Sequence, residues 1–315
     1  MQDVIESVDR ELIKQELTEE AFLRYTNNGN NEVYLVNHSN APNIVREIGR
    51  LRELSFRAAG GGTGLAFDLD DNDTGKNAYD QLVVWNADDE EIIAGYRLIK
   101  CSEVGLDEHG QINLSTAHYF HFSEQFIREY LPYTIELGRS FVQPRYQPAL
   151  DNRKGLFSLD NLWDGLGAIV MLNPDVKYLF GKVTMYPHFN KEARDLLLYF
   201  MHHYFPDPEE LVRPIRPLGY FGDVSQYDGI FDGLDYKQGY KVLNSRVRAL
   251  GENVPPLINT YMNLSLTMKV FGTAMNDEFG EVEETGIMIT LEDIHDGKKD
   301  RHMSTFVRDR ELRSK

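Results

Sequence analysis

The sequence predicts an α/β (α+β) fold in which a mixed central β-sheet is flanked by helices. Segments with apolar residues at helical spacing alternate with short runs of β-branched and aromatic residues. Hydrophobic residues make up 42% of the 315-residue chain, which is enough to bury a large core. The sequence contains no internal repeat. Alternation of the two element types is typical of a sheet covered by helices.

The first half of the chain carries clear signals for the ends of its elements. The turn-rich NNGNN stretch ends the first helical pattern, and Pro42 suits the first turn of the next helix. The polar ADDE stretch separates two strands, and Pro132 closes a later helix. We therefore expect helices at 9–24, 42–58 and 123–130, and strands at 32–37, 80–86, 91–100 and 134–142.

The second half continues the alternation. Ser158 is a candidate N-cap, and a segment rich in Pro, Gly and Asp at 206–235 predicts a long loop. We expect helices at 156–172, 190–205, 236–250 and 255–271, with strands at 177–185 and 285–291. The charged C-terminus is expected to be frayed. The predicted organisation is an N-terminal helical extension (1–40), one domain (41–295) and a charged tail (296–315).

Charge and composition exclude several classes of protein. The net charge of −17 argues against non-specific binding to nucleic acid. A single cysteine, Cys101, excludes an internal disulfide framework, and neither a signal peptide nor a membrane span is visible. We therefore expect a cytoplasmic protein. The basic residues form four groups, which are either solvated faces or a zone that meets an acidic partner. These groups are Arg46, Arg50, Arg52 and Arg57; Arg139, Arg145, Arg153 and Lys154; Arg213 and Arg216; and Lys237, Lys241, Arg246 and Arg248.

Three ordered segments, spread over about residues 45–295, carry a resemblance to a known family. The first runs from LRELSFRAAGGG through FDLDDND and YDQLVVWN to IIAGYRLIK. The second is IELGRSFVQPRYQ, and the third runs from VPPLINTYMNLSLTMKVFGTAMNDEFG to GIMITLEDI. Together they resemble the hemolysin-like branch of the GNAT acyltransferase superfamily, which includes the N-acyltransferases of bacterial ornithine-lipid and glycine-lipid synthesis.

The resemblance implies a GNAT-like fold and a specific reaction. Enzymes of this branch move a 3-hydroxyacyl chain from acyl carrier protein to the amine of an amino acid of the glycine or ornithine type, the first step of amino-acid lipid synthesis. A product with a long acyl chain implies transient contact with the inner face of the membrane. The same segments also resemble acyl-homoserine-lactone synthases, through Arg52 and Phe56, an acidic loop with Asp70 and Asp73, Arg97, and the pair Glu136 and Arg139.

Glu136 is the first candidate for the catalytic base. An attacking amine must be neutral, and a carboxylate can accept its proton. Glu136 lies in an apolar strand, so its side chain is either paired or functional. Arg139 would point to the opposite face of that strand unless Gly138 forms a bulge. The alternative is a structural ion pair between Glu136 and an arginine.

Other charged residues are candidates for binding the acceptor. Asp70, Asp73 and Asp80 could hold its ammonium group, and Arg97 or Arg52 could bind its carboxylate through the guanidinium fork. The alternative is that the three aspartates form a solvated acidic loop.

The place that corresponds to the phosphate-binding turn of GNAT enzymes is NRKGLFSLDNLW. It offers Arg153, Lys154 and Gly155 before a helix, with only one glycine of the usual pattern. This departure favours acyl carrier protein over coenzyme A as the donor, and Arg145, Arg153 and Lys154 would then steer docking. We expect no bound cofactor and no metal, because the histidines lack further ligands nearby in the sequence.

Two other functions remain open from the sequence. A signal synthase of the homoserine-lactone type would share the charged residues and require S-adenosylmethionine. A non-catalytic binding module would retain only the fold.

Overall fold

The computed structural model describes residues 1–106, 112–147, 155 and 157–307. The chain forms two compact units that alternate along the sequence. The first unit comprises Met1–Val104, Ile135–Val176 and Asp296–Lys315, and the second comprises Gly105–Thr134 and Lys177–His295. The domain boundaries expected from the sequence, at 40/41 and 295/296, stay predictions.

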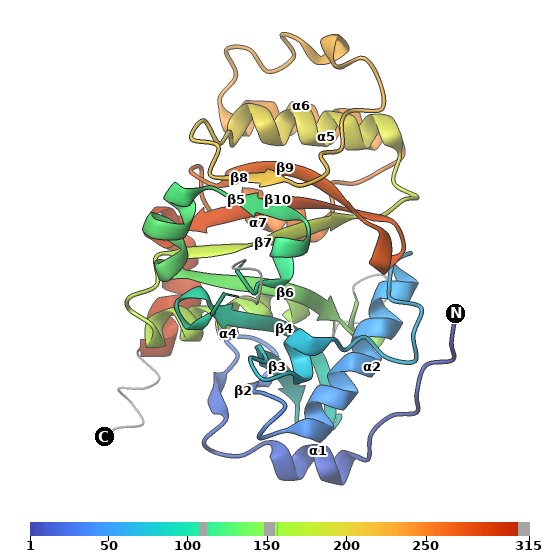
Figure 1. Ribbon diagram of the computed structural model, residues 1–315, viewed down its shortest axis with the longest axis vertical. Coiled ribbons are helices and arrows are strands. Elements are labelled where there is room, and N and C mark those ends of the chain that lie inside the picture. Colours follow the sequence, from blue (N-terminus) through green and yellow to red (C-terminus); the bar gives the residue numbers. More distant parts are fainter. Residues whose placement is uncertain (107–111, 148–154, 156, 308–315) are drawn as a thin grey trace. The chain divides into compact units, whose positions relative to one another are not determined.

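Antiparallel strands form the centre of the first unit (Figure 1). Their order is β1 (Phe22–Tyr25), β2 (Glu32–Val36), β3 (Asp80–Asn86), β4 (Glu91–Lys100) and β6 (Thr134–Val142). The helices of this unit are α1 (Arg10–Glu16), α2 (Pro42–Ala58), α3 (Asp71–Thr74), α4 (Ser158–Leu172) and α8 (Asp296–Lys299).

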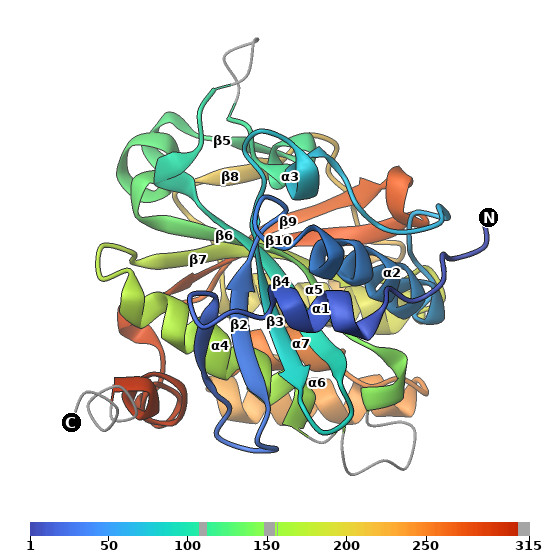
Figure 2. The same ribbon diagram turned by 90° about the horizontal axis from the view of Figure 1, so that it is seen from below.

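Helices α2 and α4 cover opposite faces of these strands (Figure 2). Alternate residues of a strand point to opposite faces, so Gln81 and Leu82 of β3 identify the two sides. Arg52 of α2 bonds Gln81, whereas Gly165 of α4 lies against Leu82, where a Cβ atom would be only 2.8 Å from a methyl group. The apolar stripe of α2 is therefore packed on the face that also carries polar side chains.

The second unit contains further strands and helices. Strands β7 (Tyr178–Met185), β10 (Val282–Thr290) and β9 (Lys269–Asn276) are antiparallel neighbours, and β5 (Phe120–Phe122) pairs with β8 (Val212–Pro214). The helices are α5 (Lys191–Tyr204), α6 (Tyr236–Ala249) and α7 (Pro256–Met262). Helix α5 packs against α6 and β9.

The predicted α/β class of the GNAT type is confirmed, and several elements match their expected bounds. The strands at 80–86, 91–100 and 134–142 and the helix at 42–58 begin and end as the sequence predicts. These segments are strongly periodic and bounded by turn residues, so local signals were sufficient.

Two predicted helices begin within one residue of their expected start but end too early for the prediction, because strand pairing overrides their local apolar spacing. The expected helix at 9–24 ends at Glu16, and residues 22–25 form β1, which pairs with β2. The expected helix at 255–271 ends at Met262, and β9 begins at Lys269 opposite Met288 of β10. In both cases the deciding partner is the next strand along the chain.

The described part of the C-terminal segment, residues 296–307, differs from the frayed tail expected from its charge, and residues 308–315 lie outside the described residues. Residues 296–304 are helical, and His302 and Phe306 are buried. His302 Nδ1 lies 2.7 Å from Asp164 Oδ1, and Arg24 donates to the His302 carbonyl at 3.1 Å. In the described part of the chain, every helix is too short or too polar to cross a membrane.

Gly167 provides a test of this C-terminal packing. A Cβ atom at Gly167 would lie 2.4 Å from the His302 carbonyl oxygen, so Gly167→Ala forces two backbone segments apart. We expect the free energy of unfolding to fall by about 1–3 kcal/mol in urea titrations followed by circular dichroism. Gly297→Ala in the same segment, where a Cβ meets nothing within 4 Å, is the control. Equal stability of Gly167→Ala and wild type would contradict the packing.

Candidate active site

A bulge in β6 lies at the centre of the site. Arg97 of β4 pairs with Gly138, but Gly95 pairs with Phe141, so β6 has one extra residue over this stretch. Arg139 has a φ of +50°, a left-handed conformation that costs a non-glycine residue about 1–2 kcal/mol. The strained position is therefore Arg139 itself, next to the glycine where the sequence predicted a bulge. Such strain is typical of functional positions.

A buried network beside this bulge centres on Asp73. Arg52 of α2 donates to Asp73 Oδ1 at 2.8 Å and to Gln81 Oε1 at 2.6 Å, and Gln81 Nε2 donates to the same Asp73 oxygen at 3.0 Å. Burial alone raises the pKa of Asp73, but Arg52 and Arg97 outweigh it and hold the pKa well below its usual range. Asp73 is therefore a charged, immobile anchor for both guanidinium groups.

Arg97 joins this anchor to Asp70. Its Nη1 atom donates to both Asp70 oxygens at 2.8 Å and to Asp73 Oδ2 at 3.2 Å. Helix α3 fixes both acids, because Asp70 is its N-cap and the Asp70 amide donates to Asp73 Oδ2 at 3.1 Å. Burial lowers the pKa of Arg97, but Asp73 and Asp70 raise it above its usual value, so the guanidinium stays charged.

Arg139 brings a third guanidinium group to the cluster and adds a further acid, Asp68. Its Nε atom lies 3.1 Å from Asp68 Oδ2, and its Nη2 atom lies 4.0 Å from Asp70 Oδ2. Burial raises the pKa of Asp68, although Arg139 acts in the opposite direction. Asp70 keeps 35% of its side chain exposed and Arg139 keeps 16%, whereas Asp73 is fully buried. These two residues form the solvent-facing edge of the cluster.

Glu136 is fully buried and accepts a hydrogen bond from the Tyr79 hydroxyl. The Arg97 guanidinium carbon lies 5.2 Å from the centre of the Tyr79 ring, which links Glu136 to the cluster. The bulge thus allows Glu136 and Arg139 to serve one site. Burial and Glu136 raise the pKa of Cys101 well above its usual value, so this cysteine is a buried thiol at neutral pH.

The sequence prediction missed three members of this site, which are Asp68, Tyr79 and Gln81. Asp68 belongs to the acidic FDLDDND segment, whose composition could have suggested it. Tyr79 and Gln81 lie on either side of Asp80, the first residue of β3. Residues two apart on a strand share a face, so the spacing of Tyr79, Gln81 and Val83 could have indicated that they lie on the same side.

Other predicted residues lie outside the cluster. Asp80 accepts a hydrogen bond from Asn37 at 3.1 Å, and burial raises its pKa. Phe56 is part of the buried face of α2.

Of the four residues expected to bind the acyl donor, the structure describes Arg145 and Gly155. Arg145 is exposed and pairs with Glu91. Gly155 packs against the chain, because a Cβ atom there would lie 2.3 Å from the Tyr146 carbonyl oxygen. Arg153 and Lys154 lie outside the described residues. The described residues contain no group of three His, Cys, Asp or Glu side chains that could hold a metal ion.

Comparison with known proteins identifies the family. Residues 51–150 match the acetyltransferase (GNAT) domain, a range that contains the cluster from Arg52 to Arg139. A glycine N(alpha)-acyltransferase of Bacteroides thetaiotaomicron is 54% identical over 307 residues, covering 98% of this chain and 91% of the relative. Another from Phocaeicola vulgatus is 51% identical over 308 residues, covering 98% and 94%. The chain belongs to this family of GNAT acyltransferases.

The family assignment confirms the predicted enzyme class, so the protein is an N-acyltransferase. Among solved structures, the N-acyl amino acid synthase FeeM from uncultured soil microbes aligns with 83% of this chain and 90% of its own. Its sequence identity is 9% and the TM-score is 0.39, which is too low to carry an argument.

Asp73→Asn tests the anchor of this N-acyltransferase. Because the pKa of folded Asp73 is lowered, its charge stabilises the fold fully above about pH 4, and this contribution is lost progressively as the pH falls from about 4 through the lower pKa of the folded state. Removing one partner of a buried pair should lower the free energy of unfolding by about 3–5 kcal/mol at pH 7. The deficit should shrink below about pH 4 in urea titrations at several pH values.

Asp71→Asn, an exposed acid on the same helix, is the control and should leave stability nearly unchanged. A deficit for Asp73→Asn that stays constant from pH 7 to pH 3 would contradict a charged Asp73.

Proposed function

We propose that the protein transfers a fatty acyl group from the thioester of acyl carrier protein to the amine of glycine, giving an N-acylglycine. The observation that carries this proposal is the match of 54% and 51% identity, over 98% of the chain, to proteins named glycine N(alpha)-acyltransferase. A 3-hydroxyacyl chain, a place at the first step of amino-acid lipid synthesis and transient contact with the inner membrane face belong to the same proposal.

The solvent-facing edge of the cluster suits a small zwitterion. Glycine carries an ammonium and a carboxylate two bonds apart, and the edge offers the Asp70 carboxylate and the Arg139 guanidinium at 4.0 Å from each other. Arg97 pairs with Asp70, and Asp68 pairs with Arg139, so both groups are held in position before substrate arrives. Arg52 and Asp73 already bond each other at 2.8 Å, so we assign them a positioning role in place of direct substrate binding.

The proton of the attacking amine needs an acceptor. We assign this role to Glu136 acting through the Tyr79 hydroxyl, because that hydroxyl donates to the buried carboxylate. The bound ammonium group first gives one proton through the Tyr79 hydroxyl to Glu136, which leaves a neutral amine. The amine nitrogen then bonds to the thioester carbonyl carbon and the carbon–sulfur bond breaks. The second proton of the nitrogen passes to the leaving thiolate, which becomes the free thiol of the carrier.

The reaction itself is tested with purified protein, 3-hydroxyacyl carrier protein and a panel of amino acids. Mass spectrometry should detect the amide of glycine, and kcat/KM for glycine should exceed that for alanine by about 10-fold or more, since one added methyl group must fit the same edge. Absence of amide with every amino acid would overturn the function. A lactone formed from S-adenosylmethionine would replace it with the signal-synthase alternative.

The proton path is tested with Tyr79→Phe and Glu136→Gln. Each should lower kcat by about 10²- to 10⁴-fold, and the double variant should be no slower than the worse single variant, because the two groups act as a unit. Tyr34→Phe is the control, since Tyr34 is another buried tyrosine that donates to a carboxylate, at 2.8 Å from Glu32. Wild-type kcat in folded Tyr79→Phe would leave Glu136 with a structural role only.

A further inference from the structure

Helix α6 (Tyr236–Ala249) has an unusual charge for this protein. Its sequence, YKQGYKVLNSRVRA, contains four cationic residues and no acidic residue, in a chain with a net charge of −17. Gly239, Leu243 and Val247 form its buried face. Gly239 allows close packing on α5, because a Cβ atom there would lie 2.1 Å from the Tyr204 hydroxyl oxygen. The four cations, Lys237, Lys241, Arg246 and Arg248, are all exposed.

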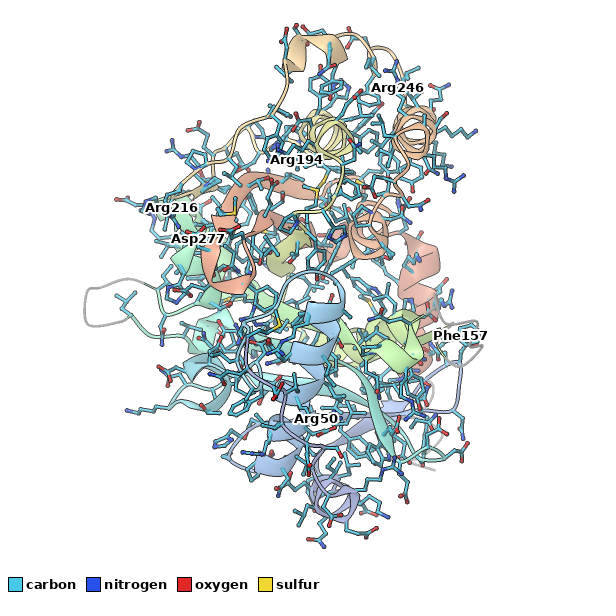
Figure 3. The ribbon with its side chains drawn as sticks, turned by 90° about the vertical axis from the view of Figure 1, so that its right-hand side faces the viewer. Arg50, Phe157, Arg194, Arg216, Arg246 and Asp277 are labelled. Atoms are coloured by element: carbon cyan, nitrogen blue, oxygen red, sulfur yellow. The ribbon has the colours of Figure 1, made fainter. Side chains whose placement is uncertain are left out.

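Three of these cations form one stripe. Successive residues of an α-helix are rotated by about 100°, so Lys237, Lys241 and Arg248 lie within about 40° of one another on the surface away from the buried face. Arg246 adds a fourth exposed cation near the C-terminal end of α6 (Figure 3). Lys237 lies in the first turn, where the helix dipole disfavours a cation, so helix stability does not account for it.

The other basic groups of the sequence are largely neutralised by acidic partners in the described part of the chain. Arg50, Arg52, Arg57, Arg139, Arg145, Arg213 and Arg216 each form an ion pair. For example, Arg216 Nη2 lies 3.0 Å from Asp277 Oδ2, and Figure 3 labels both residues. By contrast, none of the four cations of α6 pairs with an acid among the described residues. The helix therefore presents positive charge to solvent.

We propose that the exposed face of α6 is the docking surface for the acyl carrier protein, whose surface is acidic. This proposal rests on the proposed function and adds the place where the donor binds. Charge complementarity supports it, since a row of exposed cations on an acidic protein attracts an acidic partner and orients it as it approaches.

A membrane surface fits this helix less well. Helices that lie on membranes combine a basic face with large apolar side chains that insert. Helix α6 exposes no large apolar side chain, although other described parts of the protein do. The segment that precedes α6 exposes Asp223, Asp228 and Asp232, which a flat anionic surface would repel. A small protein can contact the helix alone.

Charge reversal tests the surface without touching the buried face. The variant carries Lys237→Glu, Lys241→Glu and Arg248→Glu. The control carries Arg128→Glu, Arg213→Glu and Arg216→Glu, which changes the net charge equally at exposed positions of the same unit. We measure KM and kcat with an acyl carrier protein thioester and with the corresponding N-acetylcysteamine thioester, together with direct binding of holo carrier protein by calorimetry.

The α6 variant should show at least a 10-fold higher KM for the acyl carrier thioester, with kcat and the KM for the N-acetylcysteamine thioester unchanged. Its affinity for holo carrier protein should fall by the same factor, and the wild-type KM should rise with salt, as expected for exposed charges. The control variant should retain wild-type values for both donors.

Unchanged carrier affinity in the α6 variant would overturn the docking surface. If that variant instead loses binding to vesicles of phosphatidylglycerol and phosphatidylethanolamine while its carrier affinity is unchanged, α6 is a membrane surface. The binding measurement needs no catalysis. Wild-type protein that binds carrier protein through α6 but forms no amide would therefore refute the proposed function while supporting the docking surface.

Discussion

The buried carboxylate of Asp73 is the constraint on which the site depends. It lies between the guanidinium groups of Arg52 and Arg97, and it ties α2, α3 and β4 together. Two cations cannot be buried so close together without an anion between them. Asp73 therefore allows Arg97 to remain charged inside the protein, and Arg97 in turn fixes Asp70 and supports the Tyr79 ring.

Because of the bulge in β6, one side of this buried network reaches solvent. A regular strand would direct Glu136 and Arg139 to opposite faces, since side chains alternate. The extra residue and the left-handed conformation of Arg139 bring the guanidinium to Asp68 and Asp70. Exposure increases from Asp73, which is sealed, to Asp70, which is partly open to solvent. A site of this kind is positioned by its buried half and can bind substrate with its open half.

Positive charge serves two different purposes in this acidic protein. In the first unit Arg52 and Arg97 are buried and paired with acids, so their role is to fix geometry. On α6 the cations are exposed and lie along one stripe, so their field extends into solvent. The same residue types are thus structural where they are buried with partners and available for recognition where they are not.

The sequence by itself determined the α/β fold and the bounds of α2, β3, β4 and β6, because strong periodicity and turn residues are local signals. The enzyme class followed from the resemblance of three ordered segments to a known family. The sequence also indicated Arg52, Asp70, Asp73, Arg97 and Arg139, whose order resembles that family. Only the tertiary structure decided that Tyr79, 57 residues from Glu136, is its hydrogen-bond partner, and that Gln81 and Asp68 complete the cluster. It likewise decided that residues 22–25 and 269–276 are strands. For the cluster, the physical reason is that hydrogen bonds between distant segments depend on chain packing and leave no local pattern in the sequence. For residues 22–25 and 269–276, the reason is pairing with the strand that follows each of them.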